Sequence, residues 1–274
     1  MPIVRVTRAD DPRIADYRGV PDPELLRRGG LFVAENRLVV RALLACPRFE
    51  TRSVLVTDAA FDNLRDMLEP RLDSLSVFVC DTALMQPIAG FNVHRGCLAL
   101  AARPAPLAVE QWLRGAAGAV RVVVLEAITN ADNIGGIFRS ARAFGFDAVL
   151  LGPRCCDPLY RKSVRVSIGA ALQVPFAFAA DWPTDLAALG THGFTSVALT
   201  PEADAVALEP FARGPLPDKL ALVVGNEGDG LSAEALRGCA ARVRIPMAGG
   251  VDSLNVATAA AIAMYALRPP AIGA

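Results

Sequence analysis

Residues 120–152 read VRVVVLEAITNADNIGGIFRSARAFGFDAVLLG. The segment begins with a continuous apolar run, continues with a helical spacing of apolar side chains, and ends with a second apolar run. Continuous apolar strands separated by helices of this length indicate a mostly parallel sheet that is covered on both faces. The alternation continues through a helical stretch near 160–172 and the segments SVALT (196–200), KLALVVG (219–225), SAEALRGCA (232–240) and RVRIP (242–246) to a last apolar helix. We therefore expect an α/β domain over residues 120–274.

The N-terminal part of the chain has its own alternation of strand-like and helical runs. These runs are RSVLVTD (52–58), FDNLRDML (61–68) and LSVFVCD (75–81). They predict a smaller α/β unit over residues 1–103. The next stretch has prolines and a glycine-alanine run, which is typical of a linker leading into an exposed helix, so we expect a linker over residues 104–119.

The composition limits the possible partners and compartments. Lysine plus arginine and aspartate plus glutamate each number 28, so any nucleic-acid site must be a local basic patch. The six cysteines form no CxxC pair, which favours free thiols in a reducing compartment and gives no indication of a metal site. The start, MPIVRVTRADDPR, lacks the apolar core of a signal peptide, and residues 254–267 are too short to span a membrane. We expect a cytoplasmic protein without a metal or a membrane anchor.

A first motif, NADNIGGIFRSARAFG, covers residues 130–145 directly after a predicted strand. On a helical wheel one face carries Ile134, Ile137, Phe138 and Ala141, whereas Arg139 and Arg142 project from the opposite face. Gly145 is a natural helix stop. The helix pattern alone favours an ordinary strand-to-helix turn followed by two solvated arginines, and asparagine at position 133 is common in such turns for backbone reasons.

A second motif, LVVGNEGDGLS (222–232), joins a predicted strand to a glycine-rich loop. Its glycines permit positive φ angles and a close approach of the backbone to a ligand. The loop matches neither a dinucleotide-binding turn nor a phosphate-binding P-loop, and an ordinary turn remains an alternative.

A third motif, IPMAGGVDSLNVATAAAIAMYAL (245–267), leads into a helix that is apolar nearly all round. We expect Ser253, preceded by Asp252, to be the N-cap of this helix, and capping alone would explain it. Asn255 would then lie one residue inside the helix, where asparagine has a poor propensity and needs another reason to be present.

The order and spacing of the three motifs carry more information than any one of them. Together they resemble the signature motifs of the SpoU family of RNA 2′-O-methyltransferases, within the SPOUT superfamily, and KSVRVSIGAALQVPF (162–176) resembles the substrate-facing segment of that family. The N-terminal part is similar, more loosely, to the L30e-like substrate-binding domain of many members, through GLFVAENRLVVRALL (30–44) and HRGCLAL (94–100). The usual Glu-Gly pair of that domain is Glu35-Asn36 in this chain.

The resemblance implies a deep trefoil knot in the C-terminal domain, although folds are generally unknotted. It also implies a homodimer formed through that domain, and S-adenosylmethionine bound in the knot cleft largely by main-chain groups. The cofactor positions carried over by the motifs are Gly225, Ile245 and Leu254, with Leu199, Thr200 and Met247 as neighbours of the adenine.

The resemblance assigns the central catalytic role to Arg139, with Asn133, Glu227, Ser253 and Asn255 as the remaining polar positions. Because an arginine with a pKa above about 12 rarely gives up its proton, we favour Arg139 as a clamp on the phosphate beside the target ribose. A local basic patch for RNA is predicted from Arg142, Arg154, Arg161, Lys162 and Arg165.

Two other functions compete with this interpretation. A catalytically silent RNA-binding protein of the same fold would have lost motif residues, whereas all five polar positions are filled here. A nucleotide-dependent oxidoreductase would require a GxGxxG turn and an acidic ribose ligand about 20 residues later, and the sequence has neither. The sequence leaves open whether the substrate is ribosomal or transfer RNA.

Overall fold

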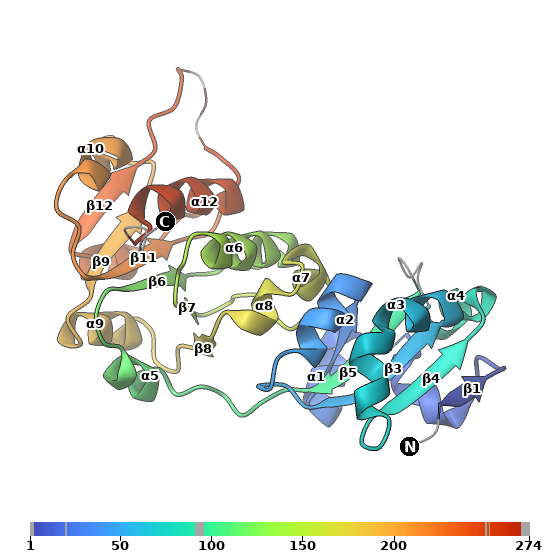
Figure 1. The fold of residues 1–274 in the computed structure, drawn as a ribbon. Coiled ribbons are helices and arrows are strands. Elements are labelled where there is room, and N and C mark those ends of the chain that lie inside the picture. The colour runs from blue at the N-terminus through green and yellow to red at the C-terminus, as the bar shows by residue number, and fades with distance from the viewer. Residues whose placement is uncertain (1–2, 20, 91–95, 250, 252, 270–274) are drawn as a thin grey trace. The chain divides into compact units, whose positions relative to one another are not determined.

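The computed structural model describes residues 3–19, 21–90, 96–249, 251 and 253–269, and it divides into two compact units (Figure 1). Unit 1 comprises Met1–Ala105 and Pro158–Gln173, and unit 2 comprises Pro106–Asp157 and Val174–Ala274. The first break lies close to the boundary expected near Arg103. Residues 106–119, expected as a linker, belong to unit 2 and contain the helix α5 (Val109–Gly115), of which only Leu113 is buried.

Unit 1 is a five-stranded mixed sheet covered by helices. Its strand order is β1-β4-β3-β5-β2, in which β1, β4 and β3 run parallel and β5 runs antiparallel to both neighbours. The strands are β1 (Val4–Val6), β2 (Leu31–Glu35), β3 (Thr51–Thr57), β4 (Ser76–Cys80) and β5 (Cys97–Ala102). The helices are α1 (Asp22–Gly29), α2 (Arg37–Leu44), α3 (Asp58–Leu68), α4 (Thr82–Ala89), α7 (Arg161–Val166) and α8 (Ala170–Gln173), with 3-10 turns at Pro12–Tyr17 and Glu69–Arg71.

The position of α7 and α8 differs from the sequence expectation, which assigned residues 158–173 to the C-terminal domain. In the structure α7 packs on β2 and α8 packs on α2. Gly169, at φ +79°, lies so close to α2 that an added Cβ would be 3.0 Å from the side chain of Ala42. The Cys46 thiol also donates to the carbonyl of Leu172. These contacts join segments more than a hundred residues apart, which the local sequence pattern does not encode.

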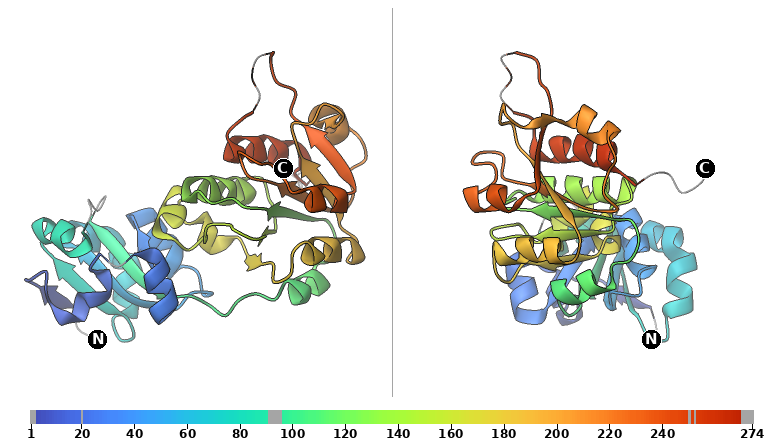
Figure 2. Two further views of the ribbon diagram at one scale, coloured as in Figure 1. Left: turned by 180° about the vertical axis from the view of Figure 1, so that it is seen from behind. Right: turned by 90° about the vertical axis from the view of Figure 1, so that its left-hand side faces the viewer.

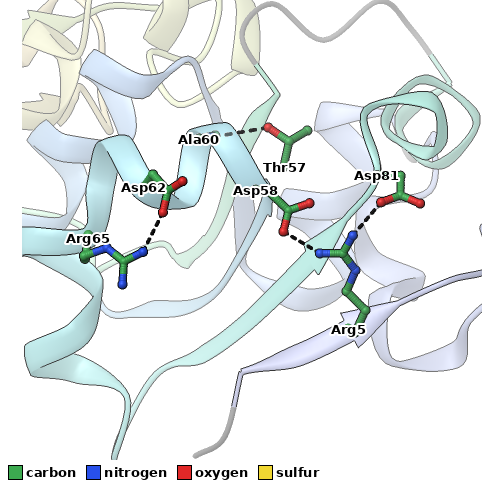
Figure 3. A network of polar contacts seen from close by, with 7 residues as sticks. All are labelled: Arg5, Thr57, Asp58, Ala60, Asp62, Arg65 and Asp81. Atoms are coloured by element: carbon green, nitrogen blue, oxygen red, sulfur yellow. Dashed lines mark hydrogen bonds and ion pairs between the residues drawn. The ribbon is translucent and has the colours of Figure 1, made fainter.

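The edge strand β1 is held by ion pairs at the carboxyl ends of β4, with which it pairs, and of β3, the next strand in the sheet. Arg5 forms ion pairs with Asp58, at the start of α3, and with Asp81, just before α4 (Figure 3). In the same region Thr57 caps α3 by accepting from the amide of Ala60. Because these ion pairs are exposed, each contributes little free energy, and they mainly fix the register of a short strand.

Unit 2 contains a seven-stranded sheet in the order β10-β12-β9-β11-β6-β7-β8, and every pairing is parallel. The strands are β6 (Val120–Leu125), β7 (Ala148–Leu151), β8 (Phe176–Phe178), β9 (Thr195–Leu199), β10 (Val206–Ala207), β11 (Lys219–Val224) and β12 (Ala241–Arg244). The central strands β6 and β11 are almost wholly buried, as their continuous apolar runs predicted. The prediction of a mixed α/β fold with a parallel sheet is therefore confirmed.

Helices cover both faces of this sheet (Figures 1 and 2). On one face α6 (Ala131–Ala143) packs against α12 (Val256–Leu267), which also contacts α10 (Leu208–Arg213) and β11. On the other face an apolar core joins the sheet to α5, α9 (Thr184–Thr191) and α11 (Ala233–Gly238). Within the described residues, no helix is both long and apolar enough to cross a membrane.

Helix α6 follows the predicted pattern. Its buried side includes Ile134, Ile137, Phe138 and Ala141, while Arg139 and Arg142 are exposed. It begins at the N-cap Asn130, whose side chain accepts from the amide of Asp132, and it ends just before Gly145 at φ +71°.

The start of α12 corrects the sequence expectation. Asn255, not Ser253, is the N-cap, and its side-chain oxygen accepts from the amide of Thr258 at 3.2 Å. Asn255 is therefore not inside the helix, and Ser253 is an exposed residue of the preceding loop. Asp252, expected next to the cap, lies outside the described residues.

Candidate active site

A cavity of about 460 Å³ in unit 2 lies at the carboxyl ends of β9, β11 and β12. In parallel α/β sheets this edge is where ligands bind. All six positions predicted to contact the cofactor line the cavity: Leu199, Thr200, Gly225, Ile245, Met247 and Leu254. Glu227 and Ser253 line it as well. Residues of the second and third motifs thus line the same cavity.

The charged residues that line this cavity are carboxylates, namely Glu202, Glu227 and Asp229. Glu202 is paired with Arg242 at 3.1 Å, which reduces the negative charge that Glu202 adds to the cavity. The remaining wall is main chain and apolar side chain, including Leu231, Leu236 and Val256. Such a lining suits a ligand with an apolar body and a positive charge.

The Glu227 carboxylate joins the three motifs. Its Oε1 atom accepts hydrogen bonds from Asn133 Nδ2 at 2.9 Å, Asn255 Nδ2 at 2.7 Å and the backbone amide of Val256 at 3.2 Å. Asn255 Nδ2 is also 3.0 Å from Asn133 Oδ1, to which it donates. Hydrogen bonds to a charged acceptor are the stronger kind. This cluster therefore fixes the starts of α6 and α12 against the glycine loop.

The glycine loop is held in a tight bend by its own backbone. Asn226 and Gly230 exchange two backbone hydrogen bonds, each 3.1 Å long, and Asn226 Nδ2 donates to the carbonyl of Ala127 at 3.1 Å. A Cβ at Gly225 would lie 2.4 Å from the carbonyl carbon and oxygen of Gly230 and 2.5 Å from the nitrogen of Leu231. Only glycine fits at position 225 without opening the loop, and Gly225 is itself one of the residues that line the cavity.

The packing of α6 on α12 also depends on a glycine. A Cβ at Gly136 would be 3.1 Å from the methyl group of Ala257, so the two helices approach closely where both carry small residues. This approach brings Asn133 on α6 within reach of Asn255, the cap of α12.

Arg139 lies on the exposed side of α6, outside the residues that line the cavity. Within the described residues its guanidinium forms no hydrogen bond or ion pair. The structure thus brings Asn133, Glu227 and Asn255 together, adds Ser253 to the cavity wall, and leaves Arg139 on solvent-facing surface.

The predicted basic residues are divided between the two units. Arg142 and Arg154, both exposed, belong to unit 2, whereas Arg161, Lys162 and Arg165 belong to α7 in unit 1. Arg161 and Arg165 are 3.9 and 3.8 Å from the carboxylate of Glu35, which is only 1% exposed. Part of the predicted positive charge is therefore balanced by a buried acid.

The six cysteines are all free thiols. Burial raises the pKa of Cys97 to about 12 and those of Cys80, Cys155 and Cys239 to about 11. These four side chains are therefore protonated near neutral pH and are poor nucleophiles. Among the described residues, no three His, Cys, Asp or Glu side chains are grouped closely enough to hold a metal ion.

Sequence reasoning did not identify two residues that shape the site. Asn226 tethers the glycine loop to the turn after β6. Glu126, next to the end of β6, is 4% exposed and binds both Trp182 and the backbone of Ser232. An acid at the end of an apolar strand is the sequence signal that could have indicated Glu126, because a buried charge requires partners.

Comparison with known proteins identifies relatives of the whole chain. An uncharacterized tRNA/rRNA methyltransferase of Mycobacterium tuberculosis is 44% identical over 260 residues, covering 93% of this chain and 88% of that protein. The 23S rRNA (guanosine-2'-O-)-methyltransferase RlmB of Ralstonia nicotianae is 31% identical over 186 residues, covering 68% and 73%. The crystal structure of an AdoMet-bound rRNA methyltransferase from Sinorhizobium meliloti has the same fold, with a TM-score of 0.79, 24% identity and 97% coverage of both chains.

The match to a family model covers the part of the chain that carries the site. Residues 120–265 match the SpoU rRNA Methylase family, and this range contains the first two motifs, the third as far as Tyr265, and the cavity. With more than half of the sequence matched, and a relative 44% identical over nearly its whole length, the chain belongs to the SpoU rRNA methylase family.

Proposed function

We propose that this protein transfers a methyl group from S-adenosylmethionine to a ribose 2′-hydroxyl of structured RNA, either ribosomal or transfer RNA. The observation that carries the proposal is the Glu227 cluster, because it joins all three family motifs beside a cavity large enough for the cofactor. A catalytically silent RNA-binding protein would have no need to retain Asn133, Glu227 and Asn255 in one connected cluster. The curated relative from Ralstonia, named as a 2′-O-methyltransferase, supports the same reaction.

The residues of the cavity fit S-adenosylmethionine. Gly225 allows the loop to bend back tightly beside the cavity, and Leu199, Thr200, Ile245, Met247 and Leu254 supply apolar and main-chain wall. The carboxylates of Glu227 and Asp229 favour a ligand that carries a positive charge. When bound, the cofactor supplies a methyl group on a positively charged sulfur, which already holds most of the electrophilic power.

The protein's own part in the reaction is to hold the ribose and to assist the loss of its proton. In this proposal Arg139 clamps the phosphate next to the target ribose, and the hydroxyl proton leaves to that phosphate or to solvent. The exposure of Arg139 supports such a contact with RNA, and its guanidinium geometry suits bidentate phosphate binding. Asn133, Glu227, Ser253 and Asn255 together orient Arg139 and the ribose, and within this group Glu227 holds the two asparagines in place.

RNA binding is proposed for two sets of residues. Unit 1, with its mixed α/β fold, is the substrate-binding domain related to L30e, and α7 supplies Arg161, Lys162 and Arg165. Arg142 and Arg154 contribute from unit 2. Residues 91–95, which include the start of the HRGCLAL segment, lie outside the described residues.

The trefoil knot and the dimer are also proposals. Support for the knot comes from α12, which follows β12 along the chain yet packs against α6 and β11. Support for a homodimer through unit 2 comes from α12, where Ile262 and Tyr265 are 40% and 56% exposed. Light scattering of the purified chain checks the dimer, and a monomer at micromolar concentration would contradict it. A cytoplasmic location is proposed from the six free thiols.

Two measurements test the proposed reaction. Calorimetry should show binding of S-adenosylmethionine by the folded protein without added metal. Mapping of 2′-O-methyl groups in total RNA from a deletion strain and its parent should reveal the lost site. Absence of heat on titration with both the cofactor and its demethylated product would contradict the enzyme assignment.

A further inference from the structure

Glu126 is a buried acid that the proposed reaction does not use. It follows β6 directly, and its side chain is 4% exposed. One carboxylate oxygen accepts from Trp182 Nε1 at 2.8 Å, and the other accepts from the backbone amide of Ser232 at 2.9 Å. Burying a carboxylate is costly unless both oxygens have partners, and here each oxygen has one.

The partner Ser232 marks the end of the glycine loop. Its side chain caps α11 by accepting from the amide of Ala235 at 3.2 Å, so its backbone determines where α11 begins. Leu231, which precedes Ser232, and Leu236, whose amide donates to the Ser232 carbonyl at 2.9 Å, both line the 460 Å³ cavity. The bond to Glu126 thus holds a backbone position that is continuous with the cavity wall.

A second bond ties the start of the same loop to the same turn. Asn226 Nδ2 donates to the carbonyl of Ala127, the residue after Glu126. The loop is therefore attached at both ends, at Asn226 and at Ser232, to two consecutive residues at the end of β6. Between these two points the chain bends back tightly, because Asn226 and Gly230 exchange two backbone hydrogen bonds.

We propose that Glu126 is a positioning residue for the cofactor site, which fixes the exit of the glycine loop through Ser232 and so holds the wall at Leu231 and Leu236. The inference rests on the proposed function, because it concerns affinity for S-adenosylmethionine. Glu126 does not line the cavity, so its effect is exerted through the loop backbone. Its loss weakens cofactor binding and leaves the chemical step intact once the cofactor is saturating.

The first test is Glu126→Ala, with Phe176→Ala as a matched control. Phe176 is 6% exposed on the edge strand β8, where its ring packs against Phe138 and Phe178, and it lies outside both the cavity wall and the core that contains Leu231 and Leu236. Glu126→Ala should raise the Kd and the KM for S-adenosylmethionine about tenfold, as expected when a hydrogen bond to a charged group is lost. Its kcat at saturating cofactor should stay within about twofold of wild type. Phe176→Ala should lower the melting temperature and leave Kd and KM unchanged.

The second test uses the two hydrogen-bond partners of the carboxylate. It relies on a substitution that keeps the size of the side chain and so leaves no cavity in the protein. In Glu126→Gln an amide group replaces one oxygen, so in either orientation an N–H of Trp182 or of Ser232 faces another donor. In the double variant Glu126→Gln with Trp182→Phe the indole donor is gone, and the amide oxygen is free to turn toward Ser232. Cofactor affinity should therefore be weakened in Glu126→Gln and recover to within about twofold of wild type in the double variant. Trp182→Phe alone should bind the cofactor like wild type.

The outcomes separate the inference from the proposed function. If wild type fails to bind S-adenosylmethionine, the proposed function fails and the inference falls with it. If wild type binds but Glu126→Ala has a lower melting temperature with an unchanged KM, Glu126 is a stability residue and the inference is overturned. Should Glu126→Ala not fold, the Glu126→Gln pair decides, and equal affinity in the single and the double variant overturns the inference.

Discussion

The amide of Asn255 donates to the carboxylate of Glu227 at 2.7 Å, although the two residues are 28 positions apart in the chain. The contact connects the N-cap of α12 to the middle of the glycine loop, and Asn133 completes it from α6. Asn255 uses both ends of its side chain, because its oxygen caps the helix while its nitrogen binds Glu227. One residue thereby sets both the start of a helix and the geometry of the site.

The first prediction concerns Glu227. Glu227→Ala removes the acceptor of three hydrogen bonds and frees Asn133 and Asn255 to move, so turnover should fall by about 100-fold. Glu227→Gln keeps an oxygen for the same donors and loses only the charge, so its loss should be clearly smaller. Single-turnover methylation of a verified RNA measures both variants. Equal losses of turnover in the two variants would show that the negative charge of Glu227 determines the rate, and that its hydrogen bonds to the two asparagines do not.

Much of unit 2 could be predicted from the sequence because its information is local. The buried face of α6 follows from a 3.6-residue spacing, and the strands β6 and β11 follow from continuous apolar runs. The positions that line the cavity followed from the family motifs, not from periodicity.

The predictions from sequence were wrong or incomplete where contacts between residues far apart in the chain determine the structure. Ser253 and Asn255 are both good N-caps, and the structure uses Asn255, whose amide also reaches Glu227. The assignment of 158–173 to unit 1 depends on contacts with Ala42 and Cys46, far away in the chain. Glu126 was missed because its partners, Trp182 and Ser232, are 56 and 106 residues away.

The second prediction concerns Gly225. Gly225→Ala places a methyl group 2.4 Å from the backbone of Gly230, so the loop must open and the cofactor wall must shift. Overpacking of this kind costs about 1–3 kcal/mol, and the Kd for S-adenosylmethionine should rise at least about tenfold. Gly238→Ala is the control, because its Cβ would be 3.6 Å from Leu186 Cδ2, an ordinary contact, and Gly238 does not line the cavity. Normal cofactor binding by Gly225→Ala in calorimetry would contradict the loop geometry.

The third prediction concerns Asn36, where the resemblance to L30e-like domains leads us to expect glycine. Asn36 has φ 89°, and its side chain caps α2 by accepting from the amide of Leu38 at 3.1 Å. Asn36→Ala keeps the strained backbone and loses the cap, which should cost about 0.5–2 kcal/mol of unfolding free energy. Asn36→Gly loses the cap but relieves the strain, so it should stay within about 1 kcal/mol of wild type. Urea unfolding measures both, and equal stability of the two variants would argue against strain at this position.

The last prediction concerns Arg139, the residue assigned to the phosphate beside the target ribose. Its side chain is exposed on α6 and forms no hydrogen bond or ion pair within the described residues, so Arg139→Ala should retain the fold and the affinity for S-adenosylmethionine. Because its proposed contact is made to the RNA in the transition state, turnover should fall by about two or more orders of magnitude. Arg142→Ala is the matched control on the same helix, since it is equally exposed and should weaken RNA binding modestly while leaving the chemical step unchanged. Single-turnover methylation at saturating RNA separates binding from chemistry, and equal rates in wild type and Arg139→Ala would reduce Arg139 to a solvated arginine without a catalytic role.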